Sequence, residues 1–289
     1  MVEIRNIDGN PNLEKRAQLG AFTIYEHKRD RSNDPATAQA SFFMQSMNFR
    51  KRQLLCDISA SSVRIQAGAM QWISGDVKSE TGLGSGASAI GGLLKNAVKG
   101  MVTGESAVKP VYSGKGFVML EPTYKYILLE DVAAWGPQGV VLDDGMFLAC
   151  ESSVGEKVVM RKNLSSVFGG EGLFNLSLTG SGIAALESNV PREELFEFEL
   201  KNDVLKIDGN MAVAWSGTLE FTVERSSKSL IGSMVNGEGL VNVYRGTGKV
   251  LMAPTVAGTT MSKANTPKEE KASKGILSTV SRISESLSN

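Results

Sequence analysis

Three glutamates with nearly constant spacing are the side chains whose type and position best suit ligand binding. Each follows a glycine and precedes a Gly-x-Gly motif, and successive glutamates lie 66 and 67 positions apart. If internal threefold symmetry gathered their carboxylates near one axis, they could bind a cation or nucleobases. Alternatively, each carboxylate binds backbone N–H groups at its own tight turn, and the like charges stay apart. These candidates are Glu105, Glu171 and Glu238.

The glycines around these glutamates predict turns. Each Gly-x-Gly is followed by an apolar run, whereas a dinucleotide-binding motif needs a strand, a glycine-rich turn and then a helix. Since glycine accepts positive φ, we interpret these residues as structural turns and not as a phosphate site. The turn glycines are Gly104, Gly114, Gly116, Gly170, Gly180, Gly182, Gly237, Gly246 and Gly248.

A basic triplet, Arg50-Lys51-Arg52, could contact phosphate groups. Lys28, Arg29 and Arg31 lie in a second charged run, and the sequence leaves open whether the two groups are neighbours. The alternative is that the triplet consists of exposed charges between strands. Acidic and basic residues balance at 31 each, so contact with nucleic acid would depend on a local patch.

Histidine and cysteine usage argues against several kinds of active site. His27 is the single histidine, so Ser-His-Asp or Cys-His machinery and multi-histidine metal sites would all have to use it. It lies in the charged run 26–31, which predicts an exposed surface histidine. Cys56 and Cys150 lie in apolar runs and predict buried free thiols in a reducing compartment. We therefore predict no catalytic residues, no metal and no cofactor, and a protein that is not an enzyme.

The spacing of apolar residues predicts an all-β chain. From residue 41 onward, short apolar runs are separated by Gly, Asp and Asn. In residues 195–200 apolar and acidic side chains alternate, as in a half-buried strand. Asp144-Gly145 and Asp208-Gly209 predict hairpin turns, because glycine accepts the positive φ that such turns require.

The repeated landmarks predict three similar β units that bury their apolar faces by packing together. We expect a pseudo-threefold arrangement, with short helices before the Gly-Glu turns. Residues 1–39 are predicted to form an N-terminal arm and strand, and residues 40–255 a three-repeat β domain with repeats of roughly 49–116, 117–182 and 183–248. A polar linker (256–274) and an amphipathic segment (275–289) are predicted to follow.

The two ends of the chain bear on location and partners. Apolar residues in the segment 275–289 fall at helical spacing, so it could dock on the chain's own body or a sister subunit, bind a partner, or lie on a membrane. Residues 1–10 are polar and resemble neither a secretory signal nor a transit peptide. No run approaches the roughly 18 apolar residues of a spanning helix. These features predict a cytoplasmic protein without a transmembrane segment.

The ordered series of motifs resembles a known family. Its members in this chain are the Gly-Gly-Leu-Leu run at 91–94 with 104–106, then 170–174, 178–182, 204–215, 237–240 and 246–251. Over roughly residues 50–253 the chain is similar to the altered-inheritance-of-mitochondria family, the twenty-fourth of its naming series, also called the mitochondrial biogenesis family. The resemblance implies a β-rich fold related to the tryptophan RNA-binding attenuator protein and supplies no catalytic residues. Mitochondrial members are linked to inner-membrane organisation and respiration; the missing transit peptide indicates a bacterial-type member here.

Three classes of function are compatible with these observations. The first is a non-catalytic β-repeat scaffold or binding protein that self-associates and binds protein partners. The second is a module that binds a small ligand or RNA, suggested by the fold analogy and by Arg50-Lys51-Arg52. The third is an enzyme that uses carboxylates without histidine.

Overall fold

The structure, a computed structural model, describes residues 2–80, 109–160, 162–163, 174–209, 211–225 and 240–255. The chain divides into two compact units, Met1–Pro254 and Thr255–Asn289, and the described strands belong to the first. Among the described residues, α1 (Ala38–Ser46) is the single α-helix. No helix in these residues is long and apolar enough to cross a membrane. The all-β prediction is confirmed. The predicted helices before the Gly-Glu turns and the segment 275–289 lie outside the described residues.

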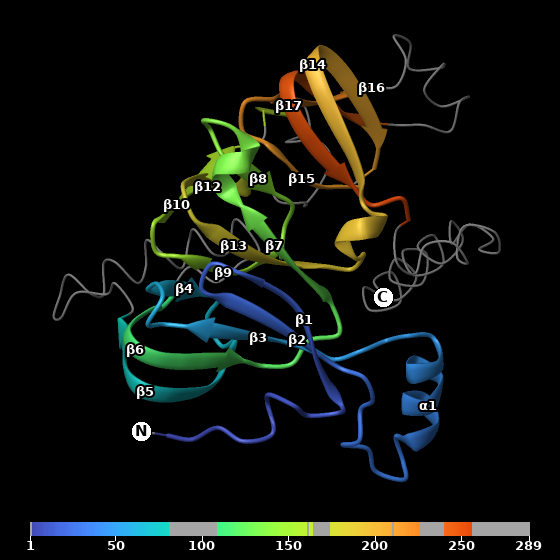
Figure 1. Cartoon of the computed structure of the whole chain (residues 1–289). Coiled ribbons are helices and arrows are strands. Elements are labelled where there is room, and N and C mark those ends of the chain that lie inside the picture. The colour runs from blue at the N-terminus through green and yellow to red at the C-terminus, as the bar shows by residue number, and fades with distance from the viewer. Residues whose placement is uncertain are drawn as a thin grey trace, which may run out of the picture. The chain divides into compact units, whose positions relative to one another are not determined.

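Two sheets make up the described part of the first unit (Figure 1). In the first sheet the strands follow the order β1-β2-β3-β6-β4-β9-β13-β7, and β5 pairs with β6. The bounds are β1 (Leu13–Leu19), β2 (Phe22–His27), β3 (Arg52–Asp57), β4 (Val63–Ile65), β5 (Met70–Glu80), β6 (Val111–Leu120), β7 (Tyr126–Asp131), β9 (Phe147–Glu151) and β13 (Ile183–Ser188).

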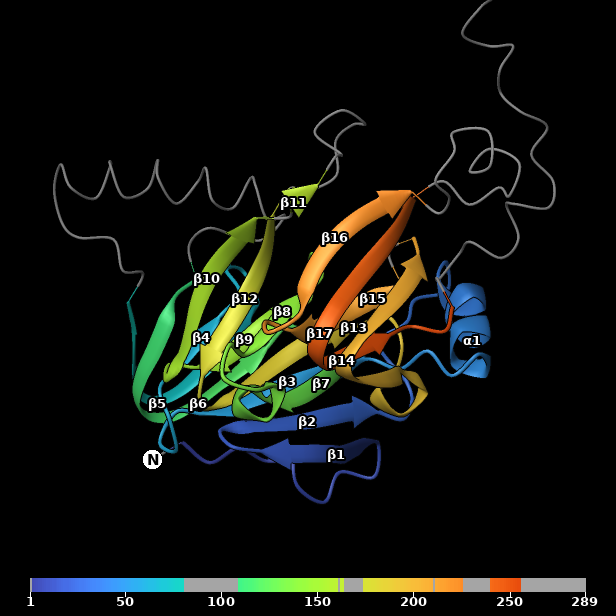
Figure 2. The same cartoon turned by 90° about the horizontal axis from the view of Figure 1, so that it is seen from above.

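The second sheet has the order β10-β12-β8-β15-β17-β16-β11, and β14 pairs with β17 (Figure 2). Its bounds are β8 (Val140–Leu142), β10 (Val154–Met160), β11 (Lys162–Asn163), β12 (Phe174–Gly180), β14 (Phe196–Asp208), β15 (Ala212–Ser216), β16 (Glu220–Arg225) and β17 (Leu240–Met252). In the described residues, two 3-10 helices, Val132–Trp135 and Arg192–Glu194, connect a strand of one sheet to a strand of the other.

One pattern of strand pairing occurs three times along the chain. A long strand pairs over its first half with one strand and over its second half with another, while a returning strand follows its whole length. The long strand is β6, then β12 with β13, then β17. Its two half-length partners are β4 and β3, then β8 and β7, then the two halves of β14. The returning strand is β5, then β9 with β10, then β15 with β16. A pseudo-threefold axis and a likeness to the tryptophan RNA-binding attenuator protein stay predictions.

Each long strand bends back on itself at a Gly-x-Gly motif. In the first set, the short segment 65–69 reaches both ends of β6. The Ile65 N–H donates to the Pro110 carbonyl at 3.0 Å, and the Glu121 N–H donates to the Ala69 carbonyl at 2.7 Å. Four residue steps span at most about 14 Å, whereas eleven steps of straight strand span about 36 Å, so β6 must bend.

The bend in each long strand lies at glycines whose backbone conformation is rarely adopted by other residues. Gly114 and Gly116 have φ of 122° and 149°, a region that side chains with a Cβ rarely adopt. The other two motifs behave alike: φ is 92° and 134° at Gly180 and Gly182, and 121° and 159° at Gly246 and Gly248. In β6 and β17 the motif lies inside a continuous strand, whereas the second motif separates β12 from β13. Gly104, Gly170 and Gly237 lie outside the described residues.

The hairpin prediction for Asp144-Gly145 and Asp208-Gly209 was wrong. Both glycines do reverse the chain with positive φ, 73° and 63°. However, β8 is not paired with β9, nor β14 with β15, in the described residues. Each turn instead connects two strands that pair with different stretches of the same long strand. Because the long strand bends back, a few residues suffice to reach from one stretch to the other.

The N-terminal residues extend the first sheet. β1 and β2 form an antiparallel hairpin, and β2 continues the ladder onto β3. Phe22 and Ile24 on β2 are buried, as expected for the predicted strand. The charged run that follows is less solvated than predicted. The side chains of Glu26 and Asp30 are only 15% and 12% exposed, because each forms an ion pair with a residue of the 51–52 segment.

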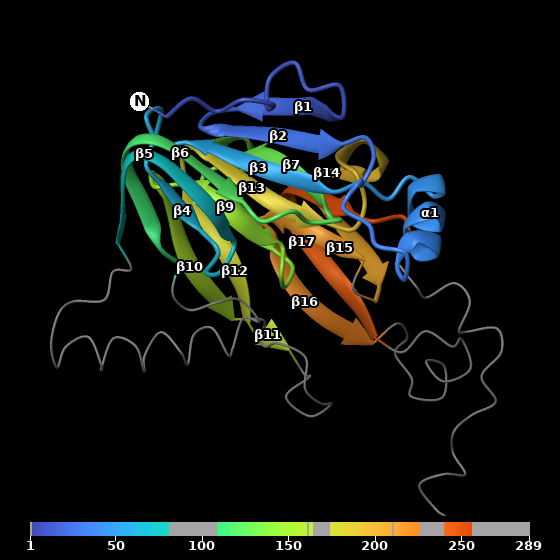
Figure 3. The ribbon, with the colours of Figure 1, turned by 90° about the horizontal axis from the view of Figure 1, so that it is seen from below.

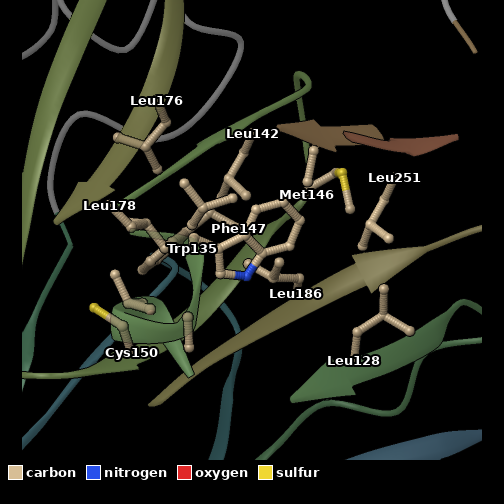
Figure 4. Close-up of a cluster of buried hydrophobic side chains, with 14 of the residues drawn as sticks. Leu128, Trp135, Leu142, Met146, Phe147, Cys150, Leu176, Leu178, Leu186 and Leu251 are labelled. Carbon is tan, nitrogen blue, oxygen red and sulfur yellow. The ribbon is translucent and has the colours of Figure 1, made fainter. Parts of the chain in front are cut away.

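Buried apolar side chains of the described residues form three clusters, each centred on one set of paired strands and extended by residues of a neighbouring set. The central cluster gathers Trp135, Phe147 and Leu186 with leucines from both sheets (Figure 4). In the third cluster Trp215 stacks on the Phe221 ring with centroids 5.3 Å apart. Cys56 and Cys150 are fully buried and free, which confirms the prediction for both thiols.

Candidate anion-binding site

The structure separates the three residues of the predicted basic triplet into three different environments. Arg52 lies on the buried face of β3, the same face that carries Leu54 and Cys56. Its guanidinium pairs with Glu26 at 2.7 Å, and its Cζ lies 3.8 Å from the centre of the Tyr126 ring. Because Arg52 is only 5% exposed and contacts Glu26 and Tyr126, its side chain stabilises the packing of the sheet and is not available to a ligand.

Arg50 is turned towards the helix that precedes it. Its Nη1 donates to the Gln45 carbonyl at 3.2 Å. That carbonyl lies in the last turn of α1, where backbone acceptors lack partners within the helix and favour a nearby positive charge. Arg50 thus caps α1.

Lys51 faces away from the core and forms an ion pair with Asp30 at 2.6 Å. Asp30 also accepts from the Ser32 hydroxyl at 2.8 Å and from the Tyr124 hydroxyl at 3.2 Å. Lys51 foremost, and also Ser32, hold the pKa of the Asp30 carboxyl well below its usual range, against the opposing effect of burial. Asp30 is therefore ionised at neutral pH and neutralises Lys51.

Replacing Asp30 with asparagine is expected to destabilise the protein by about 1 kcal/mol at neutral pH. A carboxyl whose pKa is lower in the folded state stabilises the fold above its unfolded pKa, about 3.9, and the stabilisation disappears as pH falls through the folded value. The difference in urea-unfolding free energy between wild type and Asp30→Asn should thus be full near pH 7 and shrink below about pH 4. A difference that stays constant with pH would contradict the ion pair; Glu14→Gln, in an exposed pair, is the control.

A surface cavity of about 490 Å³ lies beside this ion pair. It is formed by the end of β2 and the segment after it, the start of β3 and residues from three more distant parts of the chain. Its lining is polar and holds more basic than acidic groups. The lining residues are Asn12, His27, Arg29, Asp30, Arg31, Ser32, Lys51, Gln53, Gln71 and Pro122.

Side-chain amides fix the walls of the cavity. The Asn12 side chain donates to the Arg29 carbonyl at 2.8 Å and accepts from the Arg29 N–H at 3.0 Å. These two bonds attach the backbone of the segment after β2 to the residue that precedes β1. On the opposite wall, Gln53 Oε1 lies 2.8 Å from His27 Nε2, and Gln53 Nε2 donates to Gln71 Oε1 at 2.9 Å. His27 is half-buried and engaged, not the exposed histidine that the sequence predicted.

Two guanidiniums at the cavity are not neutralised. Within the described ranges, neither the Arg29 nor the Arg31 side chain has a hydrogen-bond or ion-pair partner, and both residues are exposed. The cavity's one carboxylate, Asp30, is already paired with Lys51. The sequence had left open whether these arginines lie near the triplet, and the structure places them around the same cavity as Lys51.

A second cavity, of about 610 Å³, lies at the third Gly-x-Gly motif. Its polar groups are largely used inside the protein: Thr247 Oγ1 accepts from the Asn202 N–H at 2.9 Å, and Thr218 donates to the Thr247 carbonyl at 2.8 Å. Lys249 lies over the Trp135 ring at 5.3 Å. This cavity therefore has fewer free polar groups than the one beside Lys51.

The three candidate glutamates, Glu105, Glu171 and Glu238, lie outside the described residues, so a binding role for them stays a prediction. In the part of the chain that is described, no three His, Cys, Asp or Glu side chains gather closely enough to hold a metal ion. The Arg29 and Arg31 cavity was not identified from the sequence, where the run 26–31 was interpreted as solvated. The available signal was an aspartate flanked by two arginines just before the Asn33-Asp34-Pro35 turn.

Comparison with known proteins adds the family. The protein-family model described as "Mitochondrial biogenesis AIM24" matches residues 45–255, more than two thirds of the chain. The chain belongs to the AIM24 family. This confirms the resemblance drawn from the ordered motifs. The match begins before the basic triplet and ends just after β17. The AIM24 region therefore contains all three long strands, β6, β12 with β13, and β17.

Bacterial proteins similar to this AIM24 chain come from Streptococcus pyogenes. An uncharacterised protein of that organism's serotype M6 is 29% identical over 194 residues, which cover 65% of this chain and 75% of the relative. A crystal structure of a Streptococcus pyogenes protein, solved as a structural-genomics target, is 27% identical. It covers 72% of this chain and 89% of its own, with a TM-score of 0.50. The cavity residues 12 to 32 precede the AIM24 match and belong to the N-terminal extension of the sheet.

Proposed function

We propose that this protein is a non-catalytic β scaffold that binds an anionic small ligand in the cavity beside Lys51. One observation carries the proposal: Arg29 and Arg31 face this cavity without a described partner, while its carboxylate is already neutralised. Three basic side chains and one acidic side chain line the cavity, so its field favours an anion.

The chemistry of the lining suits phosphate or carboxylate groups. A guanidinium presents several N–H donors in a planar fork and can bind two oxygens of such a group at once. Asn12, Gln53 and Ser32 add neutral polar groups that could orient the rest of the ligand. The anchoring of Arg29 by Asn12 reduces the ordering that binding would otherwise require.

The described residues also support a binding role without catalysis. His27, the single histidine, is held by Gln53. Burial raises the pKa of the Cys56 thiol strongly and that of the Cys150 thiol to about 12, so neither is a nucleophile at neutral pH. Two buried free cysteines also fit the reducing cytoplasm, where we place the protein.

Replacing both arginines by glutamine is expected to weaken binding of inorganic triphosphate roughly a hundredfold or more, because each lost charge-assisted hydrogen bond is worth about 1.5–3 kcal/mol and two are lost. The measurement is isothermal titration calorimetry on the full chain. The charge-matched control is Lys157→Gln with Lys201→Gln, two exposed basic residues away from the cavity, for which we expect less than about a twofold change.

Equal losses in the two double variants would overturn the cavity as the site, because binding would then follow net charge alone. Failure of wild type to bind triphosphate, a dicarboxylate and a short RNA would overturn the anionic ligand itself. Tight, steeply salt-dependent binding of the RNA alone would instead assign the cavity to a nucleic-acid backbone.

A further inference from the structure

Two short ladders join the three sets of paired strands to one another. β4 of the first set pairs antiparallel with β9 of the second, and β8 of the second set pairs antiparallel with β15 of the third. Each ladder has three residue pairs. At the centre of the first, Arg64 lies opposite Cys150; at the centre of the second, Val141 lies opposite Trp215.

These central residues occupy equivalent positions. Arg64 and Val141 each lie opposite the residue five positions before the second glycine of a Gly-x-Gly motif, and on β14 that position belongs to Lys206. Cys150 and Trp215 each lie opposite the residue two positions after that glycine, and on β5 that position belongs to Ile73. Lys206 and Ile73 are thus the counterparts that would form a third ladder.

That third ladder is not formed within the described chain. β14 pairs there with β17 alone, and β5 with β6 alone, so each keeps one unpaired edge. Figure 1 shows β5 at the bottom and β14 at the top of the first unit, and the two strands also lie apart in Figures 2 and 3. The two edges therefore cannot meet in this arrangement of one chain.

Exposure identifies the same gap. The Cys150 and Trp215 side chains are 0% and 4% exposed, but Ile73 at the equivalent place on β5 is 40% exposed. On β14 the exposed large apolar side chains are Phe196, at 53%, and Val204, at 48%. Unpaired strand edges with apolar side chains readily accept another strand.

We propose that β14 of one copy pairs antiparallel with β5 of a second copy, so that the third ladder forms between chains. The register follows from the two internal ladders: Leu205 lies opposite Ser74, Lys206 opposite Ile73, and Ile207 opposite Trp72. The contact joins two different surfaces, so each addition leaves another pair of edges, and the assembly either closes into a ring or grows as a filament. The inference is independent of the anion-binding proposal.

The register is tested by cross-linking between two variants of the full chain. Ile73→Cys mixed with Lys206→Cys and treated with a short bis-maleimide is expected to give a covalent dimer, while each variant alone stays uncross-linked. The native thiols do not interfere, because both are buried. Ile73→Cys mixed with Lys201→Cys is the matched control, since Lys201 lies outside the inferred ladder. Dimers in the control mixture at the same yield, or none in the test mixture, would overturn the register.

The assembly itself is tested by light scattering. Wild type is expected at a multiple of 30.9 kDa. Ile73→Lys sets two lysines opposite each other and should reduce the mass to one chain, and adding Lys206→Glu in the same chain should restore the multiple. A wild type of single-chain mass, or an Ile73→Lys variant of unchanged mass, would overturn the inferred contact.

Discussion

Replacing Gly116 with alanine is expected to lower the free energy of unfolding by about 4 kcal/mol, the combined cost of positive φ and of steric overlap at about 1–3 kcal/mol each. A Cβ at this position would lie 1.9 Å from the Ser74 carbonyl oxygen and 3.0 Å from the Gly75 Cα. Both atoms belong to the backbone of β5, which is paired along its whole length with β6 and cannot give way independently. The backbone also has φ of 149° there, so two separate costs add.

Urea unfolding measures this loss, and Gly246→Ala separates its two causes. Gly246 has φ of 121°, yet its nearest neighbour would lie 3.7 Å from the new Cβ, which is ordinary contact. That variant should therefore lose only the strain component, about 1–2 kcal/mol. Equal losses in the two variants would show that backbone strain, and not the close approach of β5, makes glycine necessary at the bend.

Replacing Arg52 with alanine is expected to cost about 3–5 kcal/mol, because it removes one partner of a buried ion pair. The Glu26 carboxylate, 15% exposed, would lose its charged partner at 2.7 Å. The Tyr124 carbonyl would lose a donor at 3.2 Å, and the Tyr126 ring would lose the guanidinium stacked on it. The large effect thus comes from the groups that the arginine leaves behind.

The neighbouring residue provides the matched control. Lys51→Ala removes a cation of the same triplet from a more exposed pair, and we expect a loss of no more than about 1 kcal/mol. Arg52→Met combined with Glu26→Gln removes the charge pair but keeps much of the apolar volume, and it should be less destabilising than Arg52→Ala alone. Comparable losses for Lys51→Ala and Arg52→Ala would contradict a special role for the buried pair.

The parts of the fold that follow from local alternation were predictable. In the 195–200 run, Leu200 is buried and Glu197 and Glu199 are exposed, as the alternation predicted, although Phe196 is exposed at the strand's end. The same rule could have placed Arg52 in the core, because it shares a period of two with Leu54 and Cys56. Its charge led instead to the expectation of an exposed triplet.

The parts that depend on long-range pairing were not predictable. The Asp-Gly turns have the local chemistry of hairpins, and nothing in their neighbourhood shows that the flanking strands pair elsewhere. The cavity likewise combines Asn12, the 27–32 segment, Lys51 and Gln71, which meet because β1, β2 and β3 are adjacent in the sheet and β6 joins β3 to β5. A single sequence carries no signal for such encounters beyond the charge of the residues involved.

The two ladders that join the sets of strands also determine which parts of the protein unfold locally first. The middle set is bound to a neighbour through both β8 and β9, whereas each outer set is bound on one side only in the described chain. In such a linear array, stability is distributed by nearest-neighbour coupling, and units with one neighbour fray first. We thus expect thermal fluctuations to be concentrated in the outer sets that present β5 and β14. Copies docked at both of these edges would give every set two neighbours. Assembly would then stabilise the two outer sets of strands against local unfolding, in addition to increasing the size of the particle.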